Sequence, residues 1–138
     1  MKAAHRVIDA NLNRSREALR VCEDITRFIL DDAFLTKSLK DVRHKISRIA
    51  DRLIEKSLNS RDIGRDVGKA GSFDKIKAED FTSLFYKNIH RAEESIRSLE
   101  EFSKLASKRL STDFKALRFK VYSVEKKAIK KLLTLRSN

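Results

Sequence analysis

The feature that most constrains this chain is a polar pattern that occurs twice. Asn, Arg, Glu, Arg and Glu recur at a strict spacing of three residues over 11–23, and the same series returns 77 positions later over 88–100. The segments that follow also match, because residues 39–46 resemble residues 114–121 at an offset of 75. The chain is therefore predicted to contain one structural unit twice.

The apolar residues predict four helices. They recur every three or four positions, which is the period of a helix with one buried face. The absence of Pro and the presence of only three Gly agree with long helices. The expected helices run from Ile8 to about Asp31, from an N-cap at Thr36 to Leu53, from about Asp80 to Ala106, and from about Thr112 to Leu135.

The repeat and the helices together predict the fold class. One helical hairpin occupies about 7–59 and a second about 79–136, with a Gly/Asp loop at 60–73 between them. Neither hairpin can bury its apolar stripes alone. We therefore expect one all-α domain over 1–138, an up-and-down four-helix bundle with approximate two-fold symmetry.

Composition narrows the class of protein. No stretch approaches the roughly 20 apolar residues of a membrane span, and the single Cys22 cannot form an internal disulfide. These observations predict a cytoplasmic protein that does not enter a membrane. The net charge of +12 is concentrated in 108–138, where ten Lys and Arg face two acidic residues. A basic segment of this kind raises the question of nucleic-acid binding.

Two polar positions interrupt the apolar face of the first expected helix. At about 100° per residue, Asn11 and Arg14 lie inside the apolar arc, and Asn88 and Arg91 repeat them. An Arg that projects into a core is costly unless a carboxylate or an anionic ligand meets it. These positions therefore predict either buried ion pairs or an anion site.

The neighbouring charges bear on this choice. Glu17 and Glu94, one helical turn away, suit buried Arg–Glu bridges that fix helix register. Arg43 and Arg118 also flank the apolar stripes, which predicts up to four arginines near the pseudo-axis, more than two glutamates neutralise. Such an excess favours phosphate recognition. The predicted phosphate-binding or substrate-binding residues are Asn11, Arg14, Arg43, Asn88, Arg91 and Arg118, with Glu17 and Glu94 orienting the arginines.

The loop at 60–73 contains all three glycines. Backbone N–H groups near Gly68 suit a phosphate, and the carboxylate of Asp66 suits Mg²⁺. The alternative is a plain connector, since no P-loop or protein-kinase signature accompanies these residues. Gly68 and Asp66 are thus candidates for phosphate and Mg²⁺ binding.

Other titratable residues have simpler interpretations. His44, beside Arg43, is a catalytic candidate together with Glu17 and Glu94, although a surface histidine is the alternative. The acidic doublets at 23–24 and 100–101 are predicted to be solvated, because the chain lacks the paired Glu-x-x-His motifs of di-iron bundles. Cys22 lies in the apolar arc and is predicted to be in the core.

Several of these segments carry a family resemblance. Residues 6–24 read RVIDANLNRSREALRVCED, and the likeness continues through LKDVRH at 39–44, NIHRAEESIRSLEEF at 88–102 and FKALRFKVYSVEK at 114–126. The sequence resembles a small bacterial helical family that is found alone or fused ahead of thiamine-phosphate synthase. That family is proposed to provide an alternative hydroxymethylpyrimidine-phosphate kinase.

The resemblance implies a role in thiamine biosynthesis. It implies a phosphorylated pyrimidine as ligand, ATP and Mg²⁺ as further ligands, phosphotransferase (kinase) activity, and thiamine-phosphate synthase as a partner. Two alternatives stay open: a non-catalytic module that binds a phosphorylated small molecule and acts with thiamine-phosphate synthase, and a basic nucleic-acid-binding or scaffold protein. The last is disfavoured because it would leave the five duplicated polar positions without a role. The sequence leaves open whether the bundle forms a homodimer.

Overall fold

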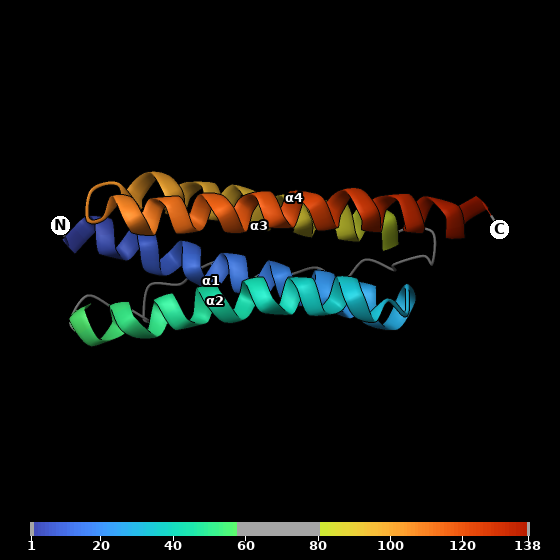
Figure 1. Cartoon of the computed structure of the whole chain (residues 1–138), viewed down its shortest axis with the longest axis horizontal. Helices are drawn as coiled ribbons and strands as arrows, with labels where there is room; N and C mark the ends of the chain where they lie inside the picture. Colours follow the sequence, from blue (N-terminus) through green and yellow to red (C-terminus); the bar gives the residue numbers. More distant parts are fainter. Residues whose placement is uncertain (1, 58–80, 138) are drawn as a thin grey trace, which may run out of the picture.

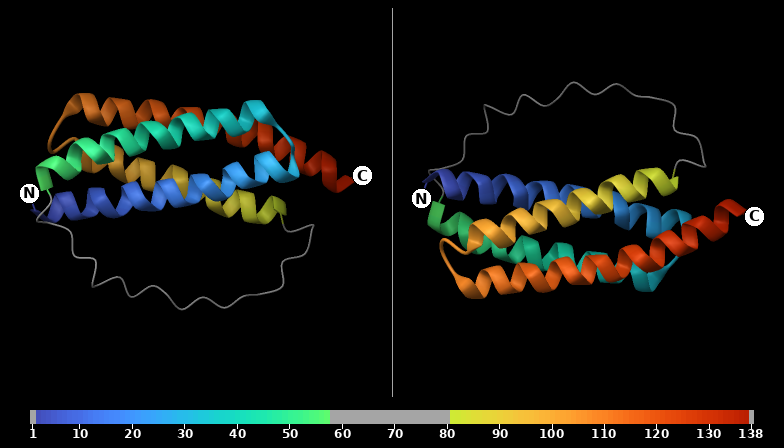
Figure 2. Two further views of the ribbon diagram at one scale, coloured as in Figure 1. Left: turned by 90° about the horizontal axis from the view of Figure 1, so that it is seen from below. Right: turned by 90° about the horizontal axis from the view of Figure 1, so that it is seen from above.

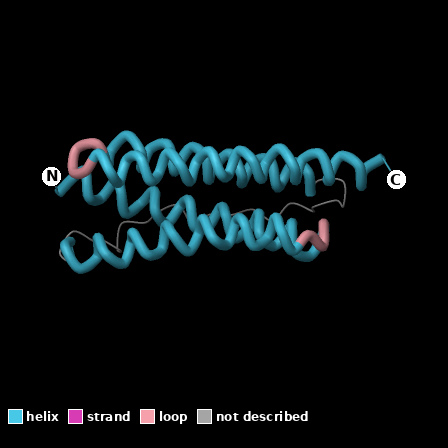
Figure 3. Tube along the Cα trace, in the orientation of Figure 1, coloured by secondary structure: helices cyan, strands magenta, loops and turns pink. Residues whose placement is uncertain are grey.

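The computed structural model describes residues 2–57 and 81–137, which are almost entirely helical (Figures 1 and 3). The predicted all-α four-helix bundle is confirmed for these residues. The expected loop at 60–73, with Gly68 and Asp66, lies outside them. The elements are α1 (Lys2–Asp24), which continues through a π-helical turn η1 (Ile25–Ile29), then α2 (Ala33–Ser57), α3 (Phe81–Ser103) and α4 (Lys108–Ser137).

The four helices form a ring in which each packs against two neighbours. Helix α1 packs most extensively against α3 and also against α2, while α4 packs against α3 and, less extensively, against α2. The views in Figure 2 show that α2 and α3 run in one direction and that α1 and α4 run in the other. Each helix is therefore antiparallel to both neighbours. Helices α2 and α3 run in the same direction at opposite corners of the ring, so the expected up-and-down order does not hold between them. The approximate two-fold symmetry stays a prediction.

The first hairpin turns at Asp31, which has a positive φ of 49°. Asp tolerates this left-handed conformation better than most residues with a side chain. The next residue caps α2, because the Leu35 N–H donates to Asp32 Oδ1 at 2.9 Å. The predicted N-cap at Thr36 is therefore wrong. Its hydroxyl instead donates to the Asp32 carbonyl and contacts Thr26 Oγ1 at 2.8 Å.

The second hairpin turns earlier than the sequence pattern indicated. Helix α3 ends at Ser103 rather than Ala106, and α4 begins at Lys108 rather than near Thr112. Ser107 provides the cap, since its Oγ accepts a hydrogen bond from the Leu110 N–H at 3.2 Å. The apolar residues keep a helical spacing through this turn, so their spacing did not reveal it. The start of α4 is set by the serine that caps it.

One apolar core extends through the described bundle. Leu19 and Cys22 of α1, Leu39 of α2, Phe85 of α3 and Phe114 of α4 are all fully buried in it. The prediction that Cys22 is a core residue is confirmed. Within the described residues, no helix combines the length and the apolar character that crossing a membrane requires.

Shortening a core side chain should be costly. Leu39→Ala removes a fully buried side chain, so we expect the free energy of unfolding to fall by about 2–5 kcal/mol. Leu105→Ala is the matched control, because Leu105 is 63% exposed and its loss should change stability by about 0.5 kcal/mol or less. Urea denaturation measures both. Equal effects of the two substitutions would contradict the assigned core.

Candidate functional site

A polar groove of about 590 Å³ lies between α1 and α3. The two helices that carry the duplicated pattern thus meet along this groove. Ala18 and Val21 add apolar surface to its lining, and Ser95 and Ser98 add hydroxyl groups. Its other lining residues are the first three polar residues of each repeat, Asn11, Arg14, Glu17, Asn88, Arg91 and Glu94.

The two asparagines are held in the same way. Asn11 Nδ2 donates to the Val7 carbonyl at 2.9 Å, and Asn88 Nδ2 donates to the Leu84 carbonyl at 2.9 Å. Both residues are buried. These bonds use the side-chain Nδ2 group of each asparagine, so its side-chain oxygen stays available as an acceptor.

The two groove arginines are exposed, so the prediction that Arg14 and Arg91 project into the core is wrong. Within 2–57 and 81–137, neither forms an ion pair with Glu17 or Glu94, which are exposed as well. The expected Arg–Glu bridges are therefore absent from this part of the structure. The groove is open to solvent, so these charges do not require an internal partner.

Arg43 has a different environment from Arg14. It binds Glu23 of α1 through two bonds, from Nε to Oε2 at 2.7 Å and from Nη2 to Oε1 at 3.0 Å. The two side chains are only 15% and 11% exposed. The hydrogen bond to Glu23 raises the pKa of Arg43, so the guanidinium stays charged. This bidentate pair joins α1 to α2.

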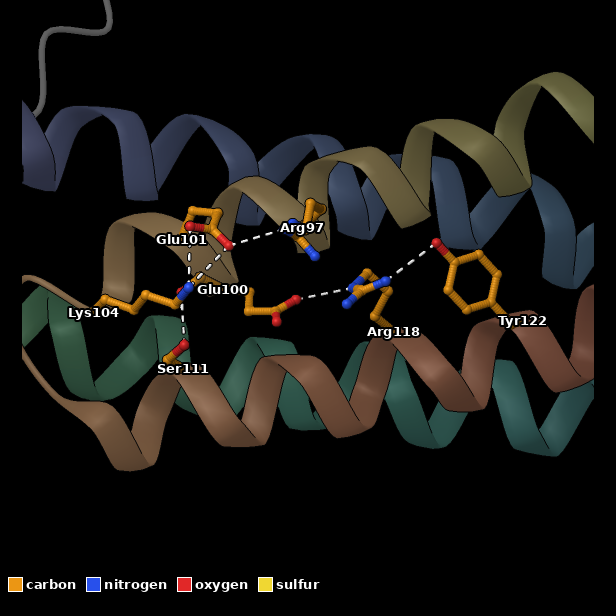
Figure 4. Close-up of polar contacts among 7 residues, drawn as sticks. All are labelled: Arg97, Glu100, Glu101, Lys104, Ser111, Arg118 and Tyr122. Carbon is orange, nitrogen blue, oxygen red and sulfur yellow. Dashed lines mark hydrogen bonds and ion pairs between the residues drawn. The ribbon is translucent and has the colours of Figure 1, made fainter.

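Arg118 makes the corresponding bond in the second hairpin (Figure 4). Its Nε donates to Glu100 Oε2 at 2.9 Å, and its Nη1 donates to the Tyr122 hydroxyl at 3.3 Å. The hydrogen bonds to Glu100 and Tyr122 raise the pKa of Arg118. The guanidinium also lies 5.1 Å from the Phe119 ring centroid, within cation–π range.

These two ion pairs correct two expectations. Four arginines do not converge on one cleft, because Arg43 and Arg118 bind internal carboxylates and do not line the groove. The acidic doublets are only partly solvated, since Glu23 and Glu100 are buried. The sequence showed only that both partners are duplicated: Glu23 recurs as Glu100 and Arg43 recurs as Arg118. Whether Arg43 and Arg118 contact a ligand stays a prediction.

The remaining candidates lie elsewhere. His44 is exposed on α2 and does not line the groove. Its catalytic role stays a prediction. The phosphate-binding candidate Gly68 and the Mg²⁺ candidate Asp66 fall outside the described residues.

A further titratable cluster was not found from the sequence. His90 Nε2 lies 3.2 Å from Glu125 Oε1 across the α3–α4 interface, and Glu93 is 6% exposed beside them. Burial, and after it the neighbouring Glu125 carboxylate, raise the pKa of Glu93 to about 9. Only the packing of α4 on α3 brings these residues together, which is why periodicity did not show them.

Removing Arg43 should destabilise the bundle. Arg43→Met leaves the Glu23 carboxylate buried without its cation, and such a loss costs about 3–5 kcal/mol. Arg14→Met is the control and should cost about 0.5 kcal/mol or less, because Arg14 is exposed. Urea denaturation measures both, and the double variant E23Q/R43M should recover much of the loss. A neutral R43M would contradict the structural role of the pair.

Glu93 should make stability depend on pH. Its pKa in the folded protein, about 9, exceeds the ordinary 4.5, so the folded state binds the proton more tightly than the unfolded state does. The free energy of unfolding should therefore fall as pH rises between these two values. Glu93→Gln should flatten this dependence. Urea denaturation across this range, with EDTA present, measures it; an unchanged slope in the variant would contradict the shift.

Similar proteins are longer than this chain. A thiamine-phosphate synthase from Thermosynechococcus vestitus is 36% identical over 121 residues, which cover 87% of this chain and 34% of that protein. Thiamine-phosphate synthases from Synechocystis sp. and Rhodopirellula baltica are 34% and 33% identical, over 89% and 86% of the chain and 35% and 32% of their own lengths.

The chain thus spans about a third of the length of the curated relatives it matches. No solved structure matches it. The match to the ThiD2 family covers residues 6–127, which include most of α1, the α1–α3 groove, both buried ion pairs and most of α4. The chain belongs to the ThiD2 family.

Proposed function

We propose that this protein acts in thiamine biosynthesis and that the α1–α3 groove binds hydroxymethylpyrimidine phosphate. The observation that carries the proposal is the pair of arginines, Arg14 and Arg91, that line one groove without an ion pair among the described residues. Two guanidinium groups facing a small cavity suit a phosphate dianion, which accepts bidentate charge-assisted bonds. The membership of the ThiD2 family and the names of the longer relatives support the pathway.

The other lining residues suit the pyrimidine. A volume of about 590 Å³ falls in the ordinary range for small-molecule sites. The side-chain oxygens of Asn11 and Asn88 can accept from the exocyclic amino group of the base. Ala18 and Val21 provide apolar contact for the ring. The groove thus combines anion-binding, hydrogen-bonding and apolar surfaces.

We further propose that the bound phosphate is itself phosphorylated, with Mg²⁺–ATP as co-substrate. An oxygen of the substrate phosphate attacks the γ-phosphorus of ATP, the bond from that phosphorus to the β,γ-bridging oxygen breaks, and ADP leaves. Such a transfer depends on positioning and on charge neutralisation, which Arg14 and Arg91 can supply. Since the attacking phosphate is already ionised, no residue needs to remove a proton from it. Glu17 and Glu94 line the same groove without an ion pair to Arg14 or Arg91 within the described residues, so an orienting role for them stays a prediction.

A second candidate function is binding without turnover. It is favoured by the absence of a P-loop or protein-kinase signature from the sequence. In this case the groove holds a phosphorylated pyrimidine and the chain delivers it to a thiamine-phosphate synthase, the activity for which the longer relatives are named. The two functions share the groove and differ in whether ADP forms.

Arg14→Met and Arg91→Met should each weaken binding of hydroxymethylpyrimidine phosphate at least about tenfold, because each removes a charge-assisted contact worth about 1.5–3 kcal/mol. Isothermal titration calorimetry measures the affinity. Arg20→Met is the matched control: Arg20 belongs to the same repeat and is exposed on α1, but it does not line the groove. Its affinity should equal that of the wild type.

The same preparations distinguish the two functions. Release of ADP that depends on hydroxymethylpyrimidine phosphate and is lost in R14M and R91M would support the kinase. Binding with no release of ADP would support the non-catalytic module. If the wild type does not bind the phosphorylated pyrimidine, with or without Mg²⁺–ATP, the proposed function is wrong.

A further inference from the structure

A second group of polar residues lies between α3 and α4, separate from the groove. His90 and Glu93 stand one turn apart on α3, and Glu125 faces them from α4. His90 Nε2 is 3.2 Å from Glu125 Oε1 and 3.8 Å from Glu93 Oε1. One ligand atom from each residue lies within 4.8 Å of the other two. An imidazole and two carboxylates thus converge on a small volume.

The two carboxylates have incomplete hydrogen bonding. Among the described residues, Glu93 Oε2 and Glu125 Oε2 are buried and have no hydrogen-bond partner. Glu93 as a whole is 6% exposed. The guanidinium of Arg118 does not meet this need, because it is bonded to Glu100 and Tyr122. Buried carboxylate oxygens are normally paired with a donor or coordinate a metal.

The repeat shows that this cluster is specific to the second hairpin. The positions that correspond to His90 and Glu93 in the first copy are Asn13 and Arg16, which bond to each other. The position that corresponds to Glu125 is Ala50, which is buried in the core. The first copy therefore has no carboxylate at any of these places. The three ligand-type residues depart from the repeat together, so the general architecture of the hairpin does not account for them.

We propose that His90, Glu93 and Glu125 bind one divalent transition-metal ion that joins α3 to α4. The two carboxylates balance the charge of the ion, and the mixture of one nitrogen and two oxygen donors suits Zn²⁺, Co²⁺ or Mn²⁺ better than Mg²⁺, which prefers oxygen and retains water. Three protein ligands leave at least one position for water.

The neighbouring side chains support this arrangement. The ring of Tyr86 packs on that of His90 with their centroids 4.0 Å apart, which restricts the imidazole. Cys22 of α1 is not a ligand in this scheme. Its thiol is a donor to the Phe85 carbonyl at 3.9 Å, and burial, with the charge of Glu93, raises its pKa so that it stays protonated.

The test uses the whole chain, with Co²⁺ and Zn²⁺ as probes and no nucleotide present. After treatment with EDTA and its removal, we expect one Zn²⁺ per chain by calorimetry and visible absorption bands on addition of Co²⁺. Zn²⁺ should also raise the melting temperature of the wild type. Both Glu93→Gln and Glu125→Gln should weaken metal binding at least about tenfold and abolish this rise.

The controls keep the test decisive. Glu93→Gln preserves shape and is neutral, as the protonated Glu93 is below pH 9, so it should fold, which circular dichroism checks. Glu101→Gln, at an exposed carboxylate on the same helix, should bind metal as the wild type does. No stoichiometric binding of Zn²⁺ or Co²⁺ by the wild type, or unchanged affinity in E93Q and E125Q, would overturn the proposal. Because no pyrimidine or ATP is used, this result is independent of the groove.

Discussion

Each hairpin is tied internally by one buried ion pair between a glutamate of its first helix and an arginine of its second. Glu23 binds Arg43 and Glu100 binds Arg118, and all four side chains are largely excluded from solvent. A buried charge is tolerated only when its partner is in place, so each pair permits little sliding of one helix along the other. We infer that these pairs fix the register on which the other polar positions depend.

This register separates the arginines into two groups. Arg43 and Arg118 are neutralised inside the hairpins, whereas Arg14 and Arg91 face the α1–α3 groove, where they have no carboxylate partner in the described part of the chain. Arg14 and Arg91 therefore keep guanidinium groups that form no ion pair within the described residues and that a phosphate can meet, while Glu17 and Glu94 line the same groove. The duplicated pattern thus has two separate roles, one within each hairpin and one between them.

Much of the fold could be predicted because helical periodicity and the repeat are local in sequence. What could not be predicted depends on helix phase and on turns. Phe28 falls on the apolar arc of the sequence pattern yet is 69% exposed, because the π-helical turn η1 alters the phase of the helix end. The start of α2 depends on Asp32 and that of α4 on Ser107, and apolar spacing does not detect either cap.

The same limit applies to the site. The repeat alone identified Asn11, Arg14, Glu17 and their copies as one set, and the structure places all six around one groove. It did not show which glutamate binds which arginine, because those bonds cross between helices. The cluster of His90, Glu93 and Glu125 was missed for the same reason, since its members belong to two helices and break the repeat.

The central claim concerns which arginines are available to a ligand. NMR of the arginine side-chain Nε–Hε groups during addition of hydroxymethylpyrimidine phosphate tests it most directly. The account predicts that the signals of Arg14 and Arg91 shift, while those of Arg43 and Arg118, held by Glu23 and Glu100, stay in place. Shifts confined to Arg43 and Arg118, or no shift in any of the four, would contradict it.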